Sequence, residues 1–230
     1  MNSVRTGSAV TRPPQNRARG LVLTNWRKVN SFNNMSCNVK AGFRIMRRHS
    51  DLPSRRHTNA TEHAMPIRKT RHKAELEAWL YLANRVRRPT LHKLSKLLYF
   101  ADKFHLEHYG RLVTGDSYIA MKNGPVPSTA YDQAKRVRAE GESVVDGAYG
   151  VDGNKDVVPR RDADLQYLSE TDVEALDHAL ETYGHLDFDR LTQASHDDSW
   201  KATTRNLPIS WDDFTHGMRD RDAIVECLGA

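Results

Sequence analysis

The sequence predicts a mainly α-helical domain with a small β element, an α+β fold, preceded by a disordered basic segment. Several stretches after residue 72 repeat apolar residues at helical spacing. Short Val-rich or Gly- and Pro-bounded stretches between them predict strands. Residues 1–64 show neither period. With 230 residues, 38% of them hydrophobic, the chain is long enough for a single compact helical domain with a β-hairpin or short sheet inserted.

Residues 1–64 form a basic leader, and residues 65–230 form the predicted domain. The leader holds twelve Arg and Lys but only two acids, which gives it a charge of +10. Because the net charge of the chain is +6, the remaining residues carry −4. The charge of the whole chain is therefore no argument for nucleic-acid binding by the domain. Three interpretations of the leader stay open: a disordered basic arm, a transit peptide, or a mis-assigned start with the true start at Met65.

Two helices open the domain. The first is expected over residues 73–86, with one apolar face formed by Ala74, Leu76, Trp79, Leu80, Ala83 and Val86. Pro89 follows its end, since the residue before proline avoids the helical region. Thr90 is then expected to cap a second helix that runs to Gly110, where a left-handed glycine ends it. This second helix is predicted to be the most buried element.

In the stretch from Thr114 to Asp132 the apolar residues no longer follow helical spacing. Residues 111–122 predict one strand, or two short ones around a turn at 114–116. Asn123-Gly124 signals a further turn, after which Pro125 and Pro127 fix φ and remove two backbone donors. We expect a rigid connection from strand to helix here, with Ser128 as the N-cap of a helix over residues 128–141.

The last third of the chain predicts a hairpin and three or four helices. The hairpin is expected within residues 143–161, around a turn at 152–154. A strong helix over residues 169–184 has Ser169 as its cap, Asp172 at the capping-box position and Gly184 at its end. One shorter amphipathic helix is expected over residues 187–204, and a final helix or two after Ser210.

No residue pattern supports catalysis, a metal site or a cofactor. Ser195-His196-Asp197 holds the letters of a triad, but adjacent side chains point in different directions. P-loop, G-x-S-x-G and G-x-G-x-x-G motifs are missing from the sequence. A metal-dependent enzyme stays open as an alternative, with ligands drawn from His105, His108, His185 and His196. Their spacing matches neither a zinc helix nor a paired Glu-x-x-His site.

Location is predicted from two negative features of the sequence. No apolar run approaches the roughly 18 residues that a membrane span needs. Cys37 and Cys227 are too few for a disulfide framework. A cytoplasmic protein with no membrane contact is therefore expected.

Two long blocks resemble one protein family. KLLYFADKFHLEHYGRLVTGDSYIAMKNGPVPSTAYD spans residues 96–132, and LSETDVEALDHALETYGHLDFDRLTQASHDDSWKAT spans residues 168–203. In order and separation they resemble the Panacea domain, the family of SocA-like antitoxins of bacteria that includes phage-associated GepA-like proteins. The resemblance covers about residues 72 to 215, and the leader has no counterpart in it.

The resemblance implies a mostly helical domain that acts as the antitoxin of a toxin–antitoxin pair. Its partner would be a cognate protein toxin encoded by an adjacent gene and neutralised by direct binding. The SocA type acts as an adaptor that delivers its toxin to the ClpXP protease, so ClpXP is a further candidate partner. Some relatives carry a helix-turn-helix domain, which is not visible here. The family supplies no catalytic residues.

The candidate partner-binding residues surround the two prolines. They are Tyr118, Met121, Gly124, Pro125, Val126, Pro127 and Tyr131. A rigid segment lowers the ordering cost of association, and large semi-apolar side chains favour interfaces. The same residues are equally suited to fixing the connection, with the tyrosines packed inside. The alternative function is a nucleic-acid-binding regulator that uses the leader.

Overall fold

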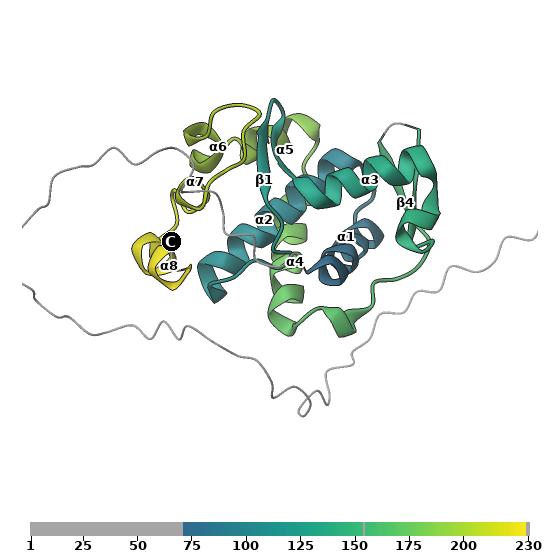
Figure 1. Ribbon diagram of the computed structural model, residues 1–230, viewed down its shortest axis with the longest axis horizontal. Coiled ribbons are helices and arrows are strands. Elements are labelled where there is room, and N and C mark those ends of the chain that lie inside the picture. The colour runs from purple at the N-terminus through teal and green to yellow at the C-terminus, as the bar shows by residue number, and fades with distance from the viewer. Residues whose placement is uncertain (1–70, 154, 229–230) are drawn as a thin grey trace, which may run out of the picture. The chain divides into compact units, whose positions relative to one another are not determined.

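A computed structural model describes residues 71–153 and 155–228 of the chain (Figure 1). The predictions for residues 1–64, and for a start at Met65, lie outside these residues. The eight helices of the described part are α1 His72–Arg85, α2 Leu91–Tyr109, α3 Ser128–Glu140, α4 Glu170–Tyr183, α5 Phe188–Ser195, α6 Asp198–Ala202, α7 Trp211–Phe214 and α8 Arg221–Leu228. Short 3-10 turns lie at Glu142–Val145 and Leu165–Tyr167. The predicted mainly helical fold is confirmed.

Two small antiparallel hairpins supply the β element. The first pairs β1 Tyr118–Met121 with β2 Gly124–Pro127, and the second pairs β3 Tyr149–Asp152 with β4 Asp156–Pro159. The second hairpin is tied to the turn between α1 and α2, because the Val157 amide donates to the Pro89 carbonyl at 2.7 Å. The first hairpin packs against α2 and α5.

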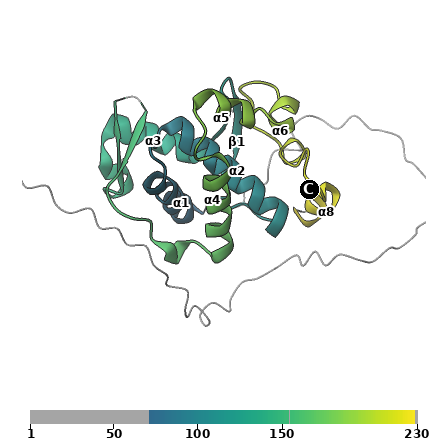
Figure 2. The ribbon, with the colours of Figure 1, turned by 180° about the vertical axis from the view of Figure 1, so that it is seen from behind.

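Helix α2 is the centre of the fold, and it has more buried residues than any other described helix, in line with the prediction that it is the most buried element. It contacts α1, α3, α4, α5 and β2, and the ribbon places it among the other elements in both views (Figures 1 and 2). Aromatic side chains join it to its neighbours: Phe100 stacks on Tyr183 with ring centroids 3.7 Å apart, and Tyr99 meets Tyr118 and Phe214 edge-on. Such pairs add specificity to the apolar burial that stabilises the core.

The predicted helix ends follow local capping chemistry. The Thr90 hydroxyl accepts from the Lys93 amide at 3.1 Å, and Gly110 adopts φ +68° at the C-cap of α2. Ser169 and Asp172 form a reciprocal capping box. Gly184 does end α4, but in a right-handed conformation with φ −61°.

Two predictions around α3 were wrong. Residues 124–127 are a strand rather than only a connection. Ser128 is the first residue of α3 and Pro127 holds the N-cap position without a side-chain cap. The cap comes from a distant residue instead: the Asp116 carboxylate accepts from the Thr129 amide at 2.9 Å and the Ala130 amide at 3.1 Å.

The single helix expected over residues 187–204 is two helices. Helix α5 ends at Ser195, and α6 starts after Asp197, whose carboxylate accepts from the Trp200 amide at 3.1 Å. An Asp that caps a new helix competes with continuation of the old one, which accounts for the break. The hairpin within residues 143–161 is confirmed, but its strands begin only at Tyr149.

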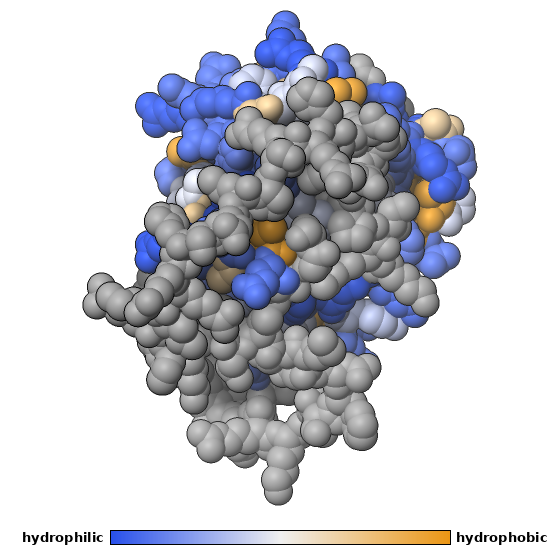
Figure 3. Space-filling view, turned by 60° about the vertical axis from the view of Figure 1, so that its left-hand side comes forward, coloured by the Kyte–Doolittle hydropathy of each residue, from blue (hydrophilic) through white to orange (hydrophobic). Residues whose placement is uncertain are grey.

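The described residues that Figure 3 leaves visible are mainly hydrophilic. On the face in Figure 3, hydrophobic residues appear only as small separate groups. None of the described helices is long and apolar enough to cross a membrane.

Candidate partner-binding surface

Strand β1 is the middle strand of a three-part layer. On one side it pairs with β2, with Ile119 opposite Val126. On the other side the Ala120 amide donates to the Leu207 carbonyl at 3.0 Å, and the Ile209 amide donates to the Tyr118 carbonyl at 2.7 Å. The hairpin is therefore held by the chain segment at residues 206–209 as well as by its own turn.

The two prolines of β2 fit this layer without loss of a ladder bond. Residues 118 and 120 direct their backbone groups toward residues 206–209, so the opposite positions 127 and 125 do not bond to β1. Proline is tolerated in a strand where its nitrogen faces away from the partner. Pro125 and Pro127 occupy these two positions, which fixes φ while β1 keeps its hydrogen bonds.

Lys96 of α2 binds the backbone of β2 on its buried side. Its ammonium donates to the Pro125 carbonyl at 2.6 Å, and the side chain is 1% exposed. Within the described residues Lys96 forms no ion pair with a carboxylate. Burial lowers the pKa of Lys96 from 10.5 to about 7. The contact thus satisfies a buried carbonyl at the cost of desolvating an amine.

Gly124 lets the hairpin approach α2 and α5 closely. Its φ is +91°, a conformation that side chains rarely adopt, and a Cβ placed on it would lie 2.2 Å from the Ser195 Oγ. The same Cβ would lie 3.0 Å from the Lys96 Nζ. Only glycine leaves room for the backbone at this point.

The far end of the hairpin is tied to α6. The Trp200 indole N–H donates to the Met121 carbonyl at 2.8 Å, and the indole stacks on His196 with centroids 3.7 Å apart. Both views show the hairpin beside α5 and α6 (Figures 1 and 2). Helices α2, α5 and α6 together fix the position of the hairpin.

A buried polar cluster supports β1 from the core. The Tyr118 hydroxyl donates to the Asp102 carboxylate at 2.7 Å, and the Thr114 hydroxyl donates to the same carboxylate at 2.6 Å. Asp102 is fully buried, and desolvation raises its pKa to about 6 even though these bonds oppose the shift. Glu75 lies close enough that Asp116 and Asp102 add to the effect of burial, and its pKa rises to about 8.

The predicted site residues therefore separate into two groups. Tyr118, Gly124, Pro125 and Pro127 are buried and hold the hairpin in place. Met121 and Val126 are partly exposed on its outer side. Tyr131 lies on α3, partly buried against the core, with the Lys135 ammonium 5.0 Å above its ring.

Two residues of the outer side were not predicted from the sequence. Ile119 alternates with the buried Tyr118 and Ala120, and its cross-strand neighbours are Val126 and Pro208. Residues opposite each other share a face, so these three side chains form one row. Strand alternation in YIAM was the signal for Ile119, whereas nothing local places Pro208 beside it. We call Ile119, Met121, Val126 and Pro208 the outer hairpin face.

Three of the four histidines considered as metal ligands serve other contacts. His105 is buried between the Arg111 carbonyl at 2.9 Å and the Thr171 hydroxyl at 3.0 Å. His108 contacts the Phe104 carbonyl at 2.8 Å, and His196 stacks on Trp200. Over residues 71–153 and 155–228, no three His, Cys, Asp or Glu side chains come together in a way that could hold a metal ion.

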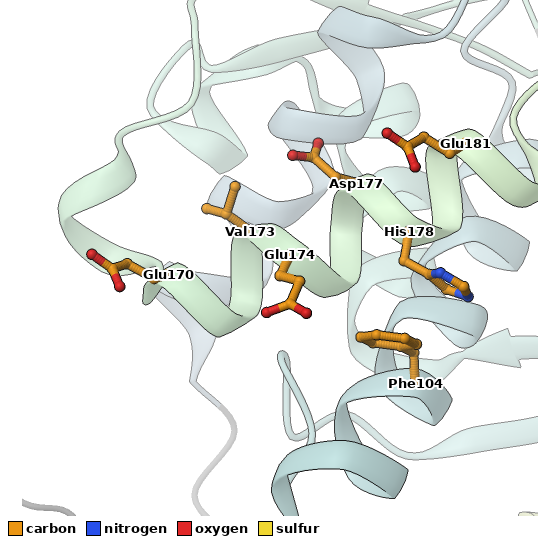
Figure 4. A pocket seen from close by; sticks show the side chains of 7 residues that line it. All are labelled: Phe104, Glu170, Val173, Glu174, Asp177, His178 and Glu181. Atoms are coloured by element: carbon orange, nitrogen blue, oxygen red, sulfur yellow. The ribbon is translucent and has the colours of Figure 1, made fainter. Parts of the chain in front are cut away.

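A second concave region lies on α4, shown in Figure 4. Its lining is Phe104 from α2 and Glu170, Val173, Glu174, Asp177, His178 and Glu181 from α4. Two of the carboxylates accept from tyrosine hydroxyls, Asp177 from Tyr81 and Glu174 from Tyr109. Four acidic side chains on one helix face repel phosphate, so this side of the domain is unsuited to nucleic acid.

The fold and the fixed hairpin define a helical domain that presents a preorganised β surface. Residues 94–201 match the family model described as antitoxin SocA-like, Panacea domain. The match lies inside the range predicted from the two sequence blocks and includes the whole β1–β2 hairpin. Neither a curated protein nor a solved structure matches the chain. This match favours a role in a toxin–antitoxin pair.

Proposed function

We propose that the chain neutralises a cognate protein toxin, encoded by an adjacent gene, by binding it directly. The observation that carries this proposal is the family match over residues 94–201, which includes most of α2, both hairpins, α5 and most of α6. The chain is then a cytoplasmic binding protein rather than an enzyme. Three of its buried polar groups support that reading, because Lys96, Asp102 and Asp116 are each occupied with fold contacts.

The preorganised hairpin is suited to this function. Binding costs free energy for each flexible group that must be ordered, and a segment fixed by prolines and by contacts on both sides avoids that cost. Delivery of the bound toxin to ClpXP is a second step that would follow the same contact. The test must therefore separate binding from degradation.

Coexpression with each adjacent open reading frame tests the proposal. A frame that is toxic alone should become harmless with this chain and should co-purify with it. Rescue in a strain without ClpXP supports sequestration, whereas loss of rescue there supports delivery. A neighbour that is harmless alone would count against the proposal.

The same experiment decides the role of the basic leader. Two versions are compared, the full chain and a chain starting at Met65. Equal rescue by both makes the leader dispensable for neutralisation. Rescue by the full chain only assigns it a function, and salt-sensitive DNA or RNA binding by the full chain would then favour the regulator alternative.

A further inference from the structure

We infer that the outer hairpin face is the toxin-binding surface and that it receives an apolar segment of the toxin that carries acidic residues. The inference rests on the proposed function and adds the location and the chemistry of the contact. The register of the three-part layer places Ile119, Val126 and Pro208 side by side, and Met121 continues the same side of β1.

All four side chains of this face are apolar. Ile119, Met121 and Val126 are partly exposed, and Pro208 is exposed. The alternate residues Tyr118 and Ala120 point inward and are buried. A short strand that needed only one buried face would ordinarily carry polar residues on the other. A continuous apolar row on the solvent side is typical of a contact surface.

Two cations border the face. Lys122 follows Met121 in the turn and is exposed. Arg205 is exposed and lies over the Trp200 ring at 5.6 Å, and Trp200 in turn binds the Met121 carbonyl. Neither cation has a carboxylate within ion-pair distance among residues 71–153 and 155–228. An apolar centre with a positive rim complements an apolar segment with a negative rim.

The chemistry also separates this face from the α4 region. The α4 region is acidic and would attract a basic partner, whereas the hairpin is bordered by Lys122 and Arg205. The hairpin has in addition a rigid backbone, fixed by Lys96 and Trp200. Rigid apolar contacts at the centre of an interface supply most of its free energy, and rim charges set its association rate and salt dependence.

The test uses the full chain and the toxin identified by coexpression. Val126→Asp places a charge in the centre of the face and should weaken the toxin Kd about thirtyfold or more. The double variant Lys122→Glu with Arg205→Glu should weaken it about tenfold and remove most of its salt dependence. Arg87→Glu with Arg88→Glu is the matched control, because both residues are exposed at the end of α1. The control should bind and rescue like the wild type.

Circular dichroism and urea unfolding establish that each variant is folded. The charge variant changes only exposed side chains, so it keeps the test decisive if Val126→Asp unfolds the hairpin. Toxin acids changed to Lys should restore binding to the Glu variants. If the wild-type chain rescues and both variants bind the toxin as tightly as it does, this inference alone is overturned. If the wild-type chain does not rescue, the proposed function is overturned with it. A dimer of the purified chain that either variant dissociates would assign the face to a second copy and overturn the inference.

Discussion

Gly124→Ala is the substitution that tests the close approach of the hairpin to α5. The new Cβ would lie 2.2 Å from the Ser195 Oγ, closer than any non-bonded contact permits. Alanine at φ +91° adds a backbone penalty of about 1–2 kcal/mol. Relief of the overlap, by rotation of the Ser195 hydroxyl out of its hydrogen bond to Thr192 or by movement of the hairpin, adds about 1–3 kcal/mol. We therefore expect Gly124→Ala to lower the free energy of unfolding by about 3 kcal/mol.

A double-mutant cycle separates these two contributions. Ser195→Ala removes the overlapping oxygen and one hydrogen bond, from its hydroxyl to the Thr192 carbonyl at 2.8 Å, at a cost of about 1 kcal/mol. In the Ser195→Ala background, Gly124→Ala should cost the backbone penalty and the milder contact with the Lys96 Nζ at 3.0 Å. The two substitutions should thus couple by about 1–2 kcal/mol in urea unfolding followed by circular dichroism. Additivity within about 0.5 kcal/mol would refute the contact, because no steric conflict would then exist.

Two further predictions concern charged groups near the hairpin. Lys96→Met should remove a pH dependence of stability. The pKa of Lys96 in the folded state is about 7, below the ordinary 10.5, so the free energy of unfolding of the wild type should rise by up to about 5 kcal/mol between about pH 7 and pH 10.5. The variant should lack this rise in urea titrations. Glu75 acts in the opposite sense, since its raised pKa lowers stability between pH 4.5 and about 8, and it does so in both proteins. A parallel pH profile in the two proteins would contradict the assignment to Lys96. Asp116→Ala should lower the free energy of unfolding by about 2 kcal/mol and speed hydrogen exchange at the Thr129 and Ala130 amides. Asp116→Asn keeps one acceptor and should recover part of the loss. Unchanged exchange would show that this carboxylate does not cap α3.

Local signals were sufficient to predict most of the helices. Thr90, Ser169 and Ser210 each cap a helix through an amide three residues ahead, so the sequence itself contains both partners. The cap of α3 was missed because its acceptor, Asp116, lies twelve residues before Ser128. A hydroxyl at the expected position looked sufficient, and only the tertiary structure shows which group reaches the amides.

The strand character of residues 124–127 was hidden for the same kind of reason. Two prolines in four residues argue against a central strand, and they are compatible with a strand only when their nitrogens face away from its partner. That condition depends on β1 directing alternate groups to residues 206–209, about 85 positions further along the chain. The burial of Tyr118 and the exposure of Pro208 follow from this layer, so the candidate site was located in the sequence but its faces were not.

The buried amine of Lys96 holds the backbone of the hairpin on its inner side, and the outer hairpin face depends on that backbone. The Pro125 carbonyl is buried and turned away from β1, so it needs a donor that the strand ladder cannot supply. A lysine from α2 supplies it, and desolvation of the amine is the energetic consequence. Substitutions on this inner side should alter folding and binding together, because they release the backbone on which the outer hairpin face depends. Substitutions on the outer side should alter binding alone, and this difference is the physical criterion by which a contact surface is distinguished from the scaffold that supports it.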